Sequence, residues 1–182
     1  MNLEEKQLNF DYKFKGRIIN LRQDTVMLPN GNTATREVVE HPGGVCVAAL
    51  TEDNELLFVR QWRYPYGEET LEIPAGKRDR KDEDPLECGK RELREETGAI
   101  AQNYIDLQPL YPTPGYINEV IYCYLATNLT FGEQDTDEDE FLDVLRIPLE
   151  KAVEMVLSGE IKDAKTQIAV LKVKTLRNAG KI

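Results

Sequence analysis

The sequence Arg91-Glu92-Leu93-Arg94-Glu95-Glu96-Thr97-Gly98 is the most informative part of this 182-residue chain. In a helix, Glu92 and Glu96 are four residues apart, so their side chains lie on nearly the same face, and Glu95 flanks that edge. Like charges at this spacing destabilise a helix, and Arg91 offsets only part of the repulsion. A divalent metal between the carboxylates would relieve it, because glutamate oxygens are ligands that Mg²⁺ prefers. The alternative is a solvated acidic face, the usual meaning of a Glu-rich helical sequence.

The flanking residues predict where this helix begins and ends. Asp84 is a suitable N-cap, Pro85 suits the first helical position, and Glu87 completes a capping-box pattern. Gly98 is expected to end the helix. Upstream, residues 71–76 (LEIPAG) are expected to end a strand in a tight turn with free backbone carbonyls. The glycine of that turn allows the backbone to approach a ligand closely.

Short strands separated by turns fill most of the remaining chain. We expect a meander over residues 8–29, extended chain at 33–40, strands at 45–50, 55–62, 105–111, 119–128 and 141–147, and helices at 148–158 and 164–178. An acidic loop is expected at 133–140. Turn signals at this spacing favour a mixed sheet over repeated βαβ units. The fold class is therefore α+β, with about three helices packed around the sheet.

Composition excludes several classes of protein. The chain has 33 acidic and 23 basic residues, a net charge of −10, which argues against a nucleic-acid partner. It contains no apolar run of the roughly 20 residues needed to span a bilayer, and its start lacks the apolar core of a signal peptide. Cys46 and Cys123 lie in apolar runs and are expected to be buried thiols, which favours a cytoplasmic location. A single histidine, His41, excludes a multi-histidine metal site, so Mg²⁺ or Mn²⁺ is expected rather than zinc.

The negative charge is concentrated in two segments. Residues 82–96 carry seven acids and three bases, and residues 133–140 carry six acids and no base. Together they account for the whole net charge of −10. The acidic excess therefore indicates a local demand for divalent metal, which can reverse the sign of a site and admit a phosphorylated ligand.

A set of residues spread over this region resembles the Nudix box, the loop–helix–loop signature of Nudix hydrolases. The set is Gly76, Glu83, Arg91-Glu92-Leu93, Glu95-Glu96 and Gly98-Ala99. Six residues separate the first glycine from Glu83 where the family has five, so Asp82 is an alternative for that position. The resemblance implies a Nudix-type α/β/α sandwich with a mixed central sheet. It also implies a β arm over residues 1–40 that crosses to the partner in a homodimer, and a hydrolase domain over 41–182.

The resemblance also implies a set of metal ligands. Glu92 and Glu96 are expected to bind Mg²⁺, with Mn²⁺ as a possible substitute, and the carbonyl of Ala75 is a further ligand. Glu95 is expected close by, through the metal or a water molecule. Arg91 is expected to orient the glutamates.

Beyond the box, the chain is similar to the ADP-ribose pyrophosphatase branch of the family. The similarity lies in residues 14–17 with 35–43, 60–65, 71–76 and 111–116. It implies that Arg36 and Arg63 contact the pyrophosphate of a nucleoside diphosphate sugar and that Arg17 lies near the adenine. Gly115 and Glu119 are further candidates for contacting the substrate. For each arginine the alternative is an ordinary surface residue or a salt bridge, with Glu37 or Glu69 as the partner.

Hydrolysis requires a base that removes a proton from the attacking water. In this branch the base is a glutamate on a loop after the sheet, so Glu138 is the first candidate and Glu140 the second; an ordinary acidic loop is the alternative. The expected products are AMP and ribose 5-phosphate. Other readings are hydrolysis of GDP-mannose, NADH or a dinucleoside polyphosphate, and a non-catalytic nucleotide sensor. An RNA-decapping role is disfavoured because the chain has no basic stripe.

Overall fold

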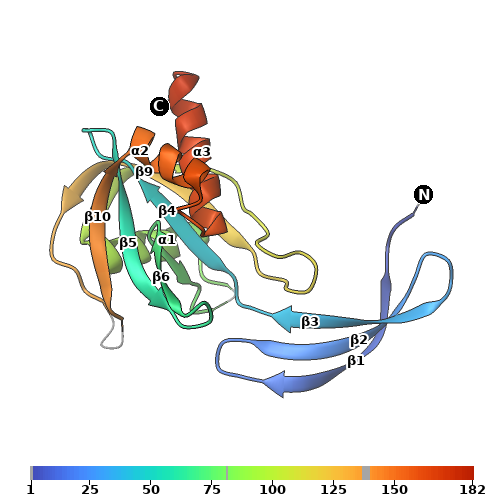
Figure 1. The fold of residues 1–182 in the computed structure, drawn as a ribbon. Coiled ribbons are helices and arrows are strands. Elements are labelled where there is room, and N and C mark those ends of the chain that lie inside the picture. Colours follow the sequence, from blue (N-terminus) through green and yellow to red (C-terminus); the bar gives the residue numbers. More distant parts are fainter. Residues whose placement is uncertain (1, 81, 137–139) are drawn as a thin grey trace. The chain divides into compact units, whose positions relative to one another are not determined.

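A computed structural model describes residues 2–80, 82–136 and 140–182 of the chain (Figure 1). The chain divides into two compact units. The first runs to Gly43 and includes Tyr111–Val120, and the second comprises Gly44–Leu110 and Ile121–Ile182. In the described part of the chain, no helix is long and apolar enough to cross a membrane.

The first unit is a three-stranded antiparallel sheet with the strand order β1-β2-β3. Its strands are β1 (Lys6–Lys15), β2 (Asn20–Met27) and β3 (Thr33–Glu40). The meander expected at residues 8–29 is thus a hairpin of two strands. The segment Tyr111–Val120 belongs to this unit because Ile117 forms a parallel bridge with Val39, and Asn118 accepts a hydrogen bond from the backbone N–H of His41.

The second unit contains two small sheets. The four-stranded sheet has the order β7-β4-β9-β8, built from β7 (Ala75–Lys77), β4 (Gly44–Ala49), β9 (Ile121–Phe131) and β8 (Ala99–Asp106). Strands β4 and β9 are parallel and the other pairs are antiparallel, which confirms the expected mixed sheet. The three-stranded sheet is antiparallel, with the order β10-β5-β6, and is built from β10 (Leu142–Pro148), β5 (Glu55–Arg63) and β6 (Glu68–Glu72).

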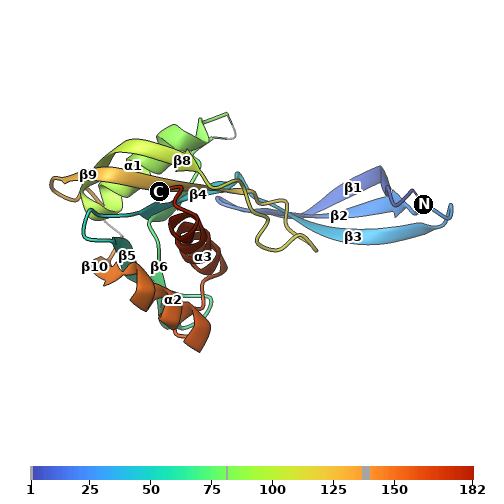
Figure 2. The same ribbon diagram turned by 90° about the horizontal axis from the view of Figure 1, so that it is seen from above.

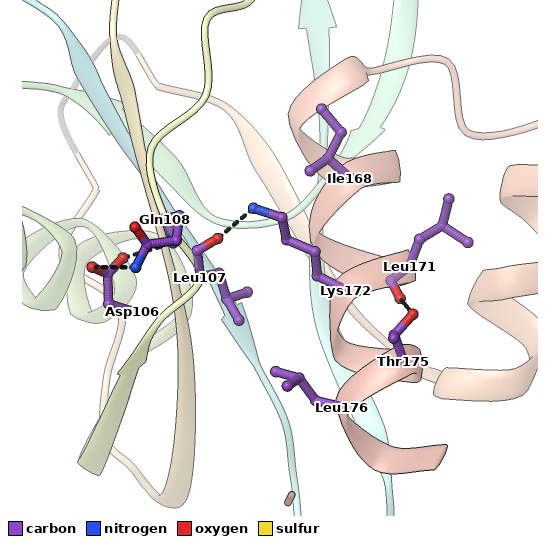
Figure 3. Close-up of a pocket in the computed structure, with 8 residues that line it drawn as sticks. All are labelled: Asp106, Leu107, Gln108, Ile168, Leu171, Lys172, Thr175 and Leu176. Atoms are coloured by element: carbon purple, nitrogen blue, oxygen red, sulfur yellow. Dashed lines mark hydrogen bonds between the residues drawn. The ribbon is translucent and has the colours of Figure 1, made fainter. Parts of the chain in front are cut away.

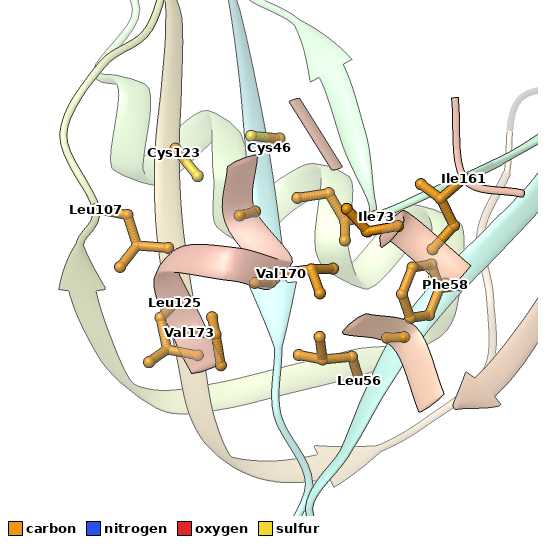
Figure 4. Close-up of a cluster of buried hydrophobic side chains, with 14 of the residues drawn as sticks. Cys46, Leu56, Phe58, Ile73, Leu107, Cys123, Leu125, Ile161, Val170 and Val173 are labelled. Carbon is orange, nitrogen blue, oxygen red and sulfur yellow. The ribbon is translucent and has the colours of Figure 1, made fainter. Parts of the chain in front are cut away.

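The described residues of the second unit also form three helices: α1 (Pro85–Thr97), α2 (Leu149–Ser158) and α3 (Ala164–Asn178). Figure 2 shows α1 and α3 on opposite sides of β4 and β9. Alternate residues of β4 face the two sides, as expected for a strand buried on both faces. Val45 and Val47 pack with the α1 residue Leu93, whereas Cys46 belongs to the core cluster that contains the α3 residue Val170 (Figure 4). The layers are therefore α/β/α, as the resemblance implied.

One expected strand is wrong, and its neighbour is shifted. Residues 105–111 were expected as a strand, but β8 covers Ala99–Asp106 and ends there. The Asp106 side chain accepts a hydrogen bond from the backbone N–H of Gln108 at 2.7 Å, and Gln108 has a left-handed φ of 71°. This turn and the following Pro109 stop the strand. The next strand, expected at 119–128, is β9 at Ile121–Phe131.

Candidate metal and nucleotide site

Helix α1 is fixed at both ends by its own sequence. The Asp84 carboxylate accepts hydrogen bonds from two backbone N–H groups of the first turn, at 2.9 and 3.0 Å, and Pro85 occupies the first helical position. Glu87 pairs with Lys90 at 2.7 Å. Gly98 ends the helix with a φ of 69°, a conformation that favours glycine. The helix therefore presents its glutamates in the predicted register.

Glu96 is the most deeply buried acid of the predicted set, with an exposed fraction of 1%. Its Oε2 accepts a hydrogen bond from the backbone N–H of Ala75 at 2.9 Å. Because the N–H and C=O of one strand residue point to the same side, the Ala75 carbonyl also faces α1. Burial raises the pKa of Glu96 to about 8; the charges of Glu140 and Glu92 act in the same direction, and the Ala75 hydrogen bond opposes them.

The carboxylate of Glu92 lies against the backbone of Gly76. A Cβ atom on Gly76 would stand 1.9 Å from Glu92 Cδ and 2.1 Å from its Oε1. The close approach expected at this glycine is therefore made by a glutamate side chain. Burial raises the pKa of Glu92 to about 7, with nearby Glu95 and Glu140 adding to the rise and Arg91 opposing it.

The expected free carbonyls of the 71–76 turn are only partly free. The Pro74 carbonyl accepts a hydrogen bond from the backbone N–H of Val47 at 2.8 Å, which that expectation missed. The turn leads directly into β7, whose first residue Ala75 pairs with Cys46 of β4. Pairing of this segment with a central strand is what fixes Ala75 beside α1.

Arg91 joins several acids at the surface of α1. Its Nη1 lies 2.9 Å from Glu92 Oε1 and 2.9 Å from Glu95 Oε2, and its Nη2 lies 3.5 Å from Glu83 Oε1. Glu83 also accepts a hydrogen bond from the backbone N–H of Asp79 at 2.7 Å. Asp82 is exposed, which leaves Glu83 as the acid that organises this loop.

The donors gathered here suit a hard divalent cation. The carboxylates of Glu92 and Glu96 and the carbonyl of Ala75 are all oxygen donors, the kind that Mg²⁺ or Mn²⁺ binds. Within residues 2–80, 82–136 and 140–182, no three His, Cys, Asp or Glu side chains already form a metal-binding group. Arg91 holds Glu92 and Glu95 instead, so a bound cation would have to take over the Arg91 contact with Glu92.

The first residues of the acidic loop contact the C-terminal end of α1. The Gln134 side chain donates to the Glu96 carbonyl at 2.5 Å, and the Asp135 N–H donates to the Glu95 carbonyl at 3.0 Å, so both satisfy terminal carbonyls of the helix. The charge of Glu140 contributes to the raised pKa of both Glu92 and Glu96. Glu138, the first candidate for the base, lies outside the described residues.

Arg63 lies in the second unit and is held by an acid that was not expected. Its Nε and Nη2 donate to the two carboxylate oxygens of Glu72 at 2.6 and 2.7 Å. Arg63 therefore does form a salt bridge, but its partner is Glu72 rather than Glu37 or Glu69. The register of β5 and β6 places Glu68 opposite Arg63, so the Arg63 side chain reaches along β6 to Glu72.

The other predicted substrate residues belong to the first unit. Arg36 forms two bonds to Glu5, at 2.6 and 2.9 Å, rather than pairing with Glu37. Arg17 is exposed, and a Cβ atom on Gly115 would meet open space. Glu119 lies 3.3 Å from Nδ1 of His41.

Comparisons with known proteins show the family to which the chain belongs. The NUDIX domain family profile matches residues 40–169, and the profile of the nucleoside diphosphate sugar hydrolase N-terminal domain matches residues 5–39. The chain belongs to the Nudix family.

Two relatives of this Nudix hydrolase match nearly its whole length. An ADP-ribose pyrophosphatase of Bacillus subtilis (strain 168) is 40% identical over 171 residues, which cover 93% of this chain and 92% of the relative. A methanol dehydrogenase activator of Bacillus methanolicus is 41% identical over 169 residues, which cover 92% and 91%. A crystal structure of an ADP compounds hydrolase superposes with a TM-score of 0.86 over 100% of both chains at 22% identity, which shows the shared fold.

The sequence did not reveal the ion pair between Lys165 and Glu72 in this Nudix domain. Lys165 on α3 bonds Glu72, although 93 residues separate them. No local pattern identifies such a pair, because it depends on how α3 packs against the end of β6. Only the unusual position of a lysine in the first turn of an otherwise core-packed helix could have drawn attention to it.

The Nudix domain also has a cavity away from the predicted residues. It has a volume of about 480 Å³ and lies between the end of β8 and α3 (Figure 3). Leu107, Ile168, Leu171 and Leu176 contribute most of its apolar lining, and Lys172 bonds the Leu107 carbonyl across it. None of the predicted catalytic, metal or substrate residues that the structure describes is among its lining residues.

Proposed function

We propose that the chain hydrolyses the pyrophosphate bond of ADP-ribose in a reaction that depends on Mg²⁺ and releases AMP and ribose 5-phosphate. The observation that carries this proposal is the similarity of the chain, over more than nine-tenths of its length, to an ADP-ribose pyrophosphatase. The oxygen-donor set beside Gly76 supports it, because a pyrophosphate substrate requires a cation between its own charge and the glutamates.

In this proposal Glu92, Glu96 and the Ala75 carbonyl hold the cation, and Glu95 lies close to it. Mn²⁺ is a possible substitute for Mg²⁺. The cation, when bound, supplies electrostatic neutralisation of the phosphate oxygens. Arg91 orients Glu92 and Glu95 through the contacts described above.

The remaining roles are those of the base and of the residues that bind the substrate. Glu138, or Glu140 in its place, accepts the proton of the attacking water. Arg63 and Arg36 donate to the pyrophosphate, since guanidinium groups bind phosphate oxygens with a rigid fork of donors. Arg17 lies near the adenine.

In this proposal Gly115 and Glu119 also contact the substrate. The protein is proposed to act as a homodimer in the cytoplasm, with its N-terminal arm reaching the partner.

A substrate panel tests this function directly. Purified protein is incubated with Mg²⁺ and, separately, with ADP-ribose, GDP-mannose, NADH or a dinucleoside polyphosphate, and the products are identified by chromatography. We expect AMP and ribose 5-phosphate from ADP-ribose at the highest kcat/KM, and no product after chelation of the metal. A higher kcat/KM for GDP-mannose would transfer the assignment to that sugar, and tight binding without turnover would favour a nucleotide sensor.

A second candidate follows from the other close relative, which is named for activating methanol dehydrogenase. The chain would then raise the rate of a methanol dehydrogenase. This is measured by adding the wild-type protein or its Glu96→Gln variant to that enzyme. Stimulation by both proteins would favour activation without hydrolysis, whereas stimulation by the wild type alone would make it a consequence of the hydrolase.

A further inference from the structure

A buried ionic network joins the sheet of the second unit to its last helix. At its centre is Glu72, whose side chain is 3% exposed. Arg63 donates two hydrogen bonds to it, the Thr70 hydroxyl donates to Oε1 at 2.6 Å, and Lys165 bonds Oε2. Lys165 also lies 3.0 Å from the N-cap residue of α3, Asp163. The Glu72 carboxylate therefore has hydrogen-bond partners on both oxygens.

This network borders the glutamate site. The hydrogen bond to Glu72 is the main cause that raises the pKa of Arg63, and the charge of Glu96 adds to it. In return, burial raises the pKa of Glu96 while the charge of Lys165 lowers it. Both cations thus lie within electrostatic range of Glu96. Glu72 is also only three residues from Ala75, whose N–H binds Glu96.

Among the residues that the structure describes, Glu72 occupies one edge of the Arg63 guanidinium. Its Nε and Nη2 are fixed by Glu72, whereas Nη1 lies outside that pair and the side chain is 38% exposed. A side chain that is already fixed loses little conformational entropy when a ligand binds. Arg63 and Lys165 together balance Glu72 and Asp163, so the network is neutral as a whole, and the exposed Nη1 of Arg63 is the cationic donor that it offers to an anionic ligand.

We propose that Lys165 is a positioning residue for the substrate: through Glu72 it holds Arg63 with its free edge toward the pyrophosphate of a nucleoside diphosphate sugar. This inference rests on the proposed function. It adds to that function a role for the C-terminal helix α3, which carries no part of the Nudix box.

The test compares two lysine-to-methionine variants on α3. Lys165→Met removes the bond to Glu72 and the contact with Asp163, and Lys172→Met is the matched control, because Lys172 bonds the distant Leu107 carbonyl. The measurements are KM and kcat for ADP-ribose with Mg²⁺, and the Kd of non-hydrolysable α,β-methylene ADP-ribose by calorimetry. We expect Lys165→Met to raise KM and Kd by about tenfold with a smaller change in kcat, and the control to change neither. Unchanged KM and Kd in Lys165→Met would overturn the proposal.

A double-mutant cycle separates positioning from a purely structural role. If Lys165 acts through Arg63, then Arg63→Gln should cost much less in the Lys165→Met background than in the wild type, and Lys165→Arg should recover part of the lost affinity. Additive losses would refute the link. If Lys165→Met does not fold, Lys165→Gln removes the charge beside Glu72 with a polar side chain in place and enters the same cycle.

The failure of the proposed function is recognised separately. Wild-type protein that hydrolyses no nucleotide sugar would refute the function itself. The Kd measurements with the analogue would still decide the role of Lys165.

Discussion

Gly76→Ala should reduce turnover by about a hundredfold while leaving the fold intact. The added Cβ would stand 1.9 Å from Glu92 Cδ, where an ordinary contact begins at 3.4 Å, so the carboxylate must move by about 1.5 Å, the difference between the two. Glu92 has a flexible side chain with three rotatable bonds, and it can swing outward without moving the backbone of α1. The atom that must move is therefore the proposed metal ligand rather than the core.

The loss of turnover caused by a displacement of this size is known to an order of magnitude. Misplacement of a reacting group by about 1 Å reduces turnover by about a hundredfold, which corresponds to about 2.7 kcal/mol of transition-state stabilisation. The assay is release of phosphate from ADP-ribose products by an added phosphatase, with thermal unfolding followed by circular dichroism. Gly132→Ala is the control, because its Cβ would meet only the Gly98 carbonyl oxygen, at 3.8 Å.

The result that would refute this reasoning is a folded Gly76→Ala protein with kcat/KM within about threefold of the wild type. Glu92 could then leave its position against Gly76 without consequence, and it would not be a ligand. Loss of activity together with a large fall in the unfolding temperature would instead indicate that the α1 packing depends on this glycine.

Three further predictions concern single carboxylates. Glu96→Gln should reduce turnover by at least about a hundredfold with the fold retained, and near-normal hydrolysis would exclude Glu96 as a ligand. Glu138→Gln should lower kcat more than it raises KM; if Glu140→Gln does so instead, the base is Glu140. Burial by itself would raise the pKa of Glu72, but Arg63 and Lys165 outweigh it and lower that pKa from 4.5 to about 2. The ionised form of Glu72 therefore stabilises the fold above pH 4.5, and about 3 kcal/mol is lost as pH falls toward 2. Urea unfolding at pH 6 and pH 3 measures this loss, and Glu72→Gln should remove that part of the pH dependence; an unchanged pH dependence in the variant would contradict it.

The sequence predicted α1 well because all its signals are local. Asp84 and Pro85 begin the helix and Gly98 ends it, and the spacing of Glu92 and Glu96 follows from the helical repeat alone. The strand expected at 105–111 was wrong because the residue at which a strand ends depends on the turn that follows it. The side chain of Asp106 forms that turn, and nothing in the apolar pattern indicates it.

Contacts between distant segments could not be predicted in the same way. The bond between Arg63 and Glu72 could not be read from the strand pairing, because the register places Glu68 opposite Arg63. Lys165 reaches Glu72 only because α3 begins near the end of β6. The Pro74 carbonyl, expected to be free, is taken by a strand whose position depends on the whole sheet.

The position of the acids explains how a chain with a net charge of −10 can suit an anionic substrate. The guanidinium of Arg91 is shared among Glu83, Glu92 and Glu95, and one positive charge cannot neutralise three carboxylates. Glu96 adds a fourth carboxyl that is buried against Ala75, where charge is costly without a partner. A divalent cation placed among these oxygens would offset the remaining charge and present its own field to the phosphates. The acidic excess is thus a reason to expect metal-dependent pyrophosphate binding rather than an argument against it.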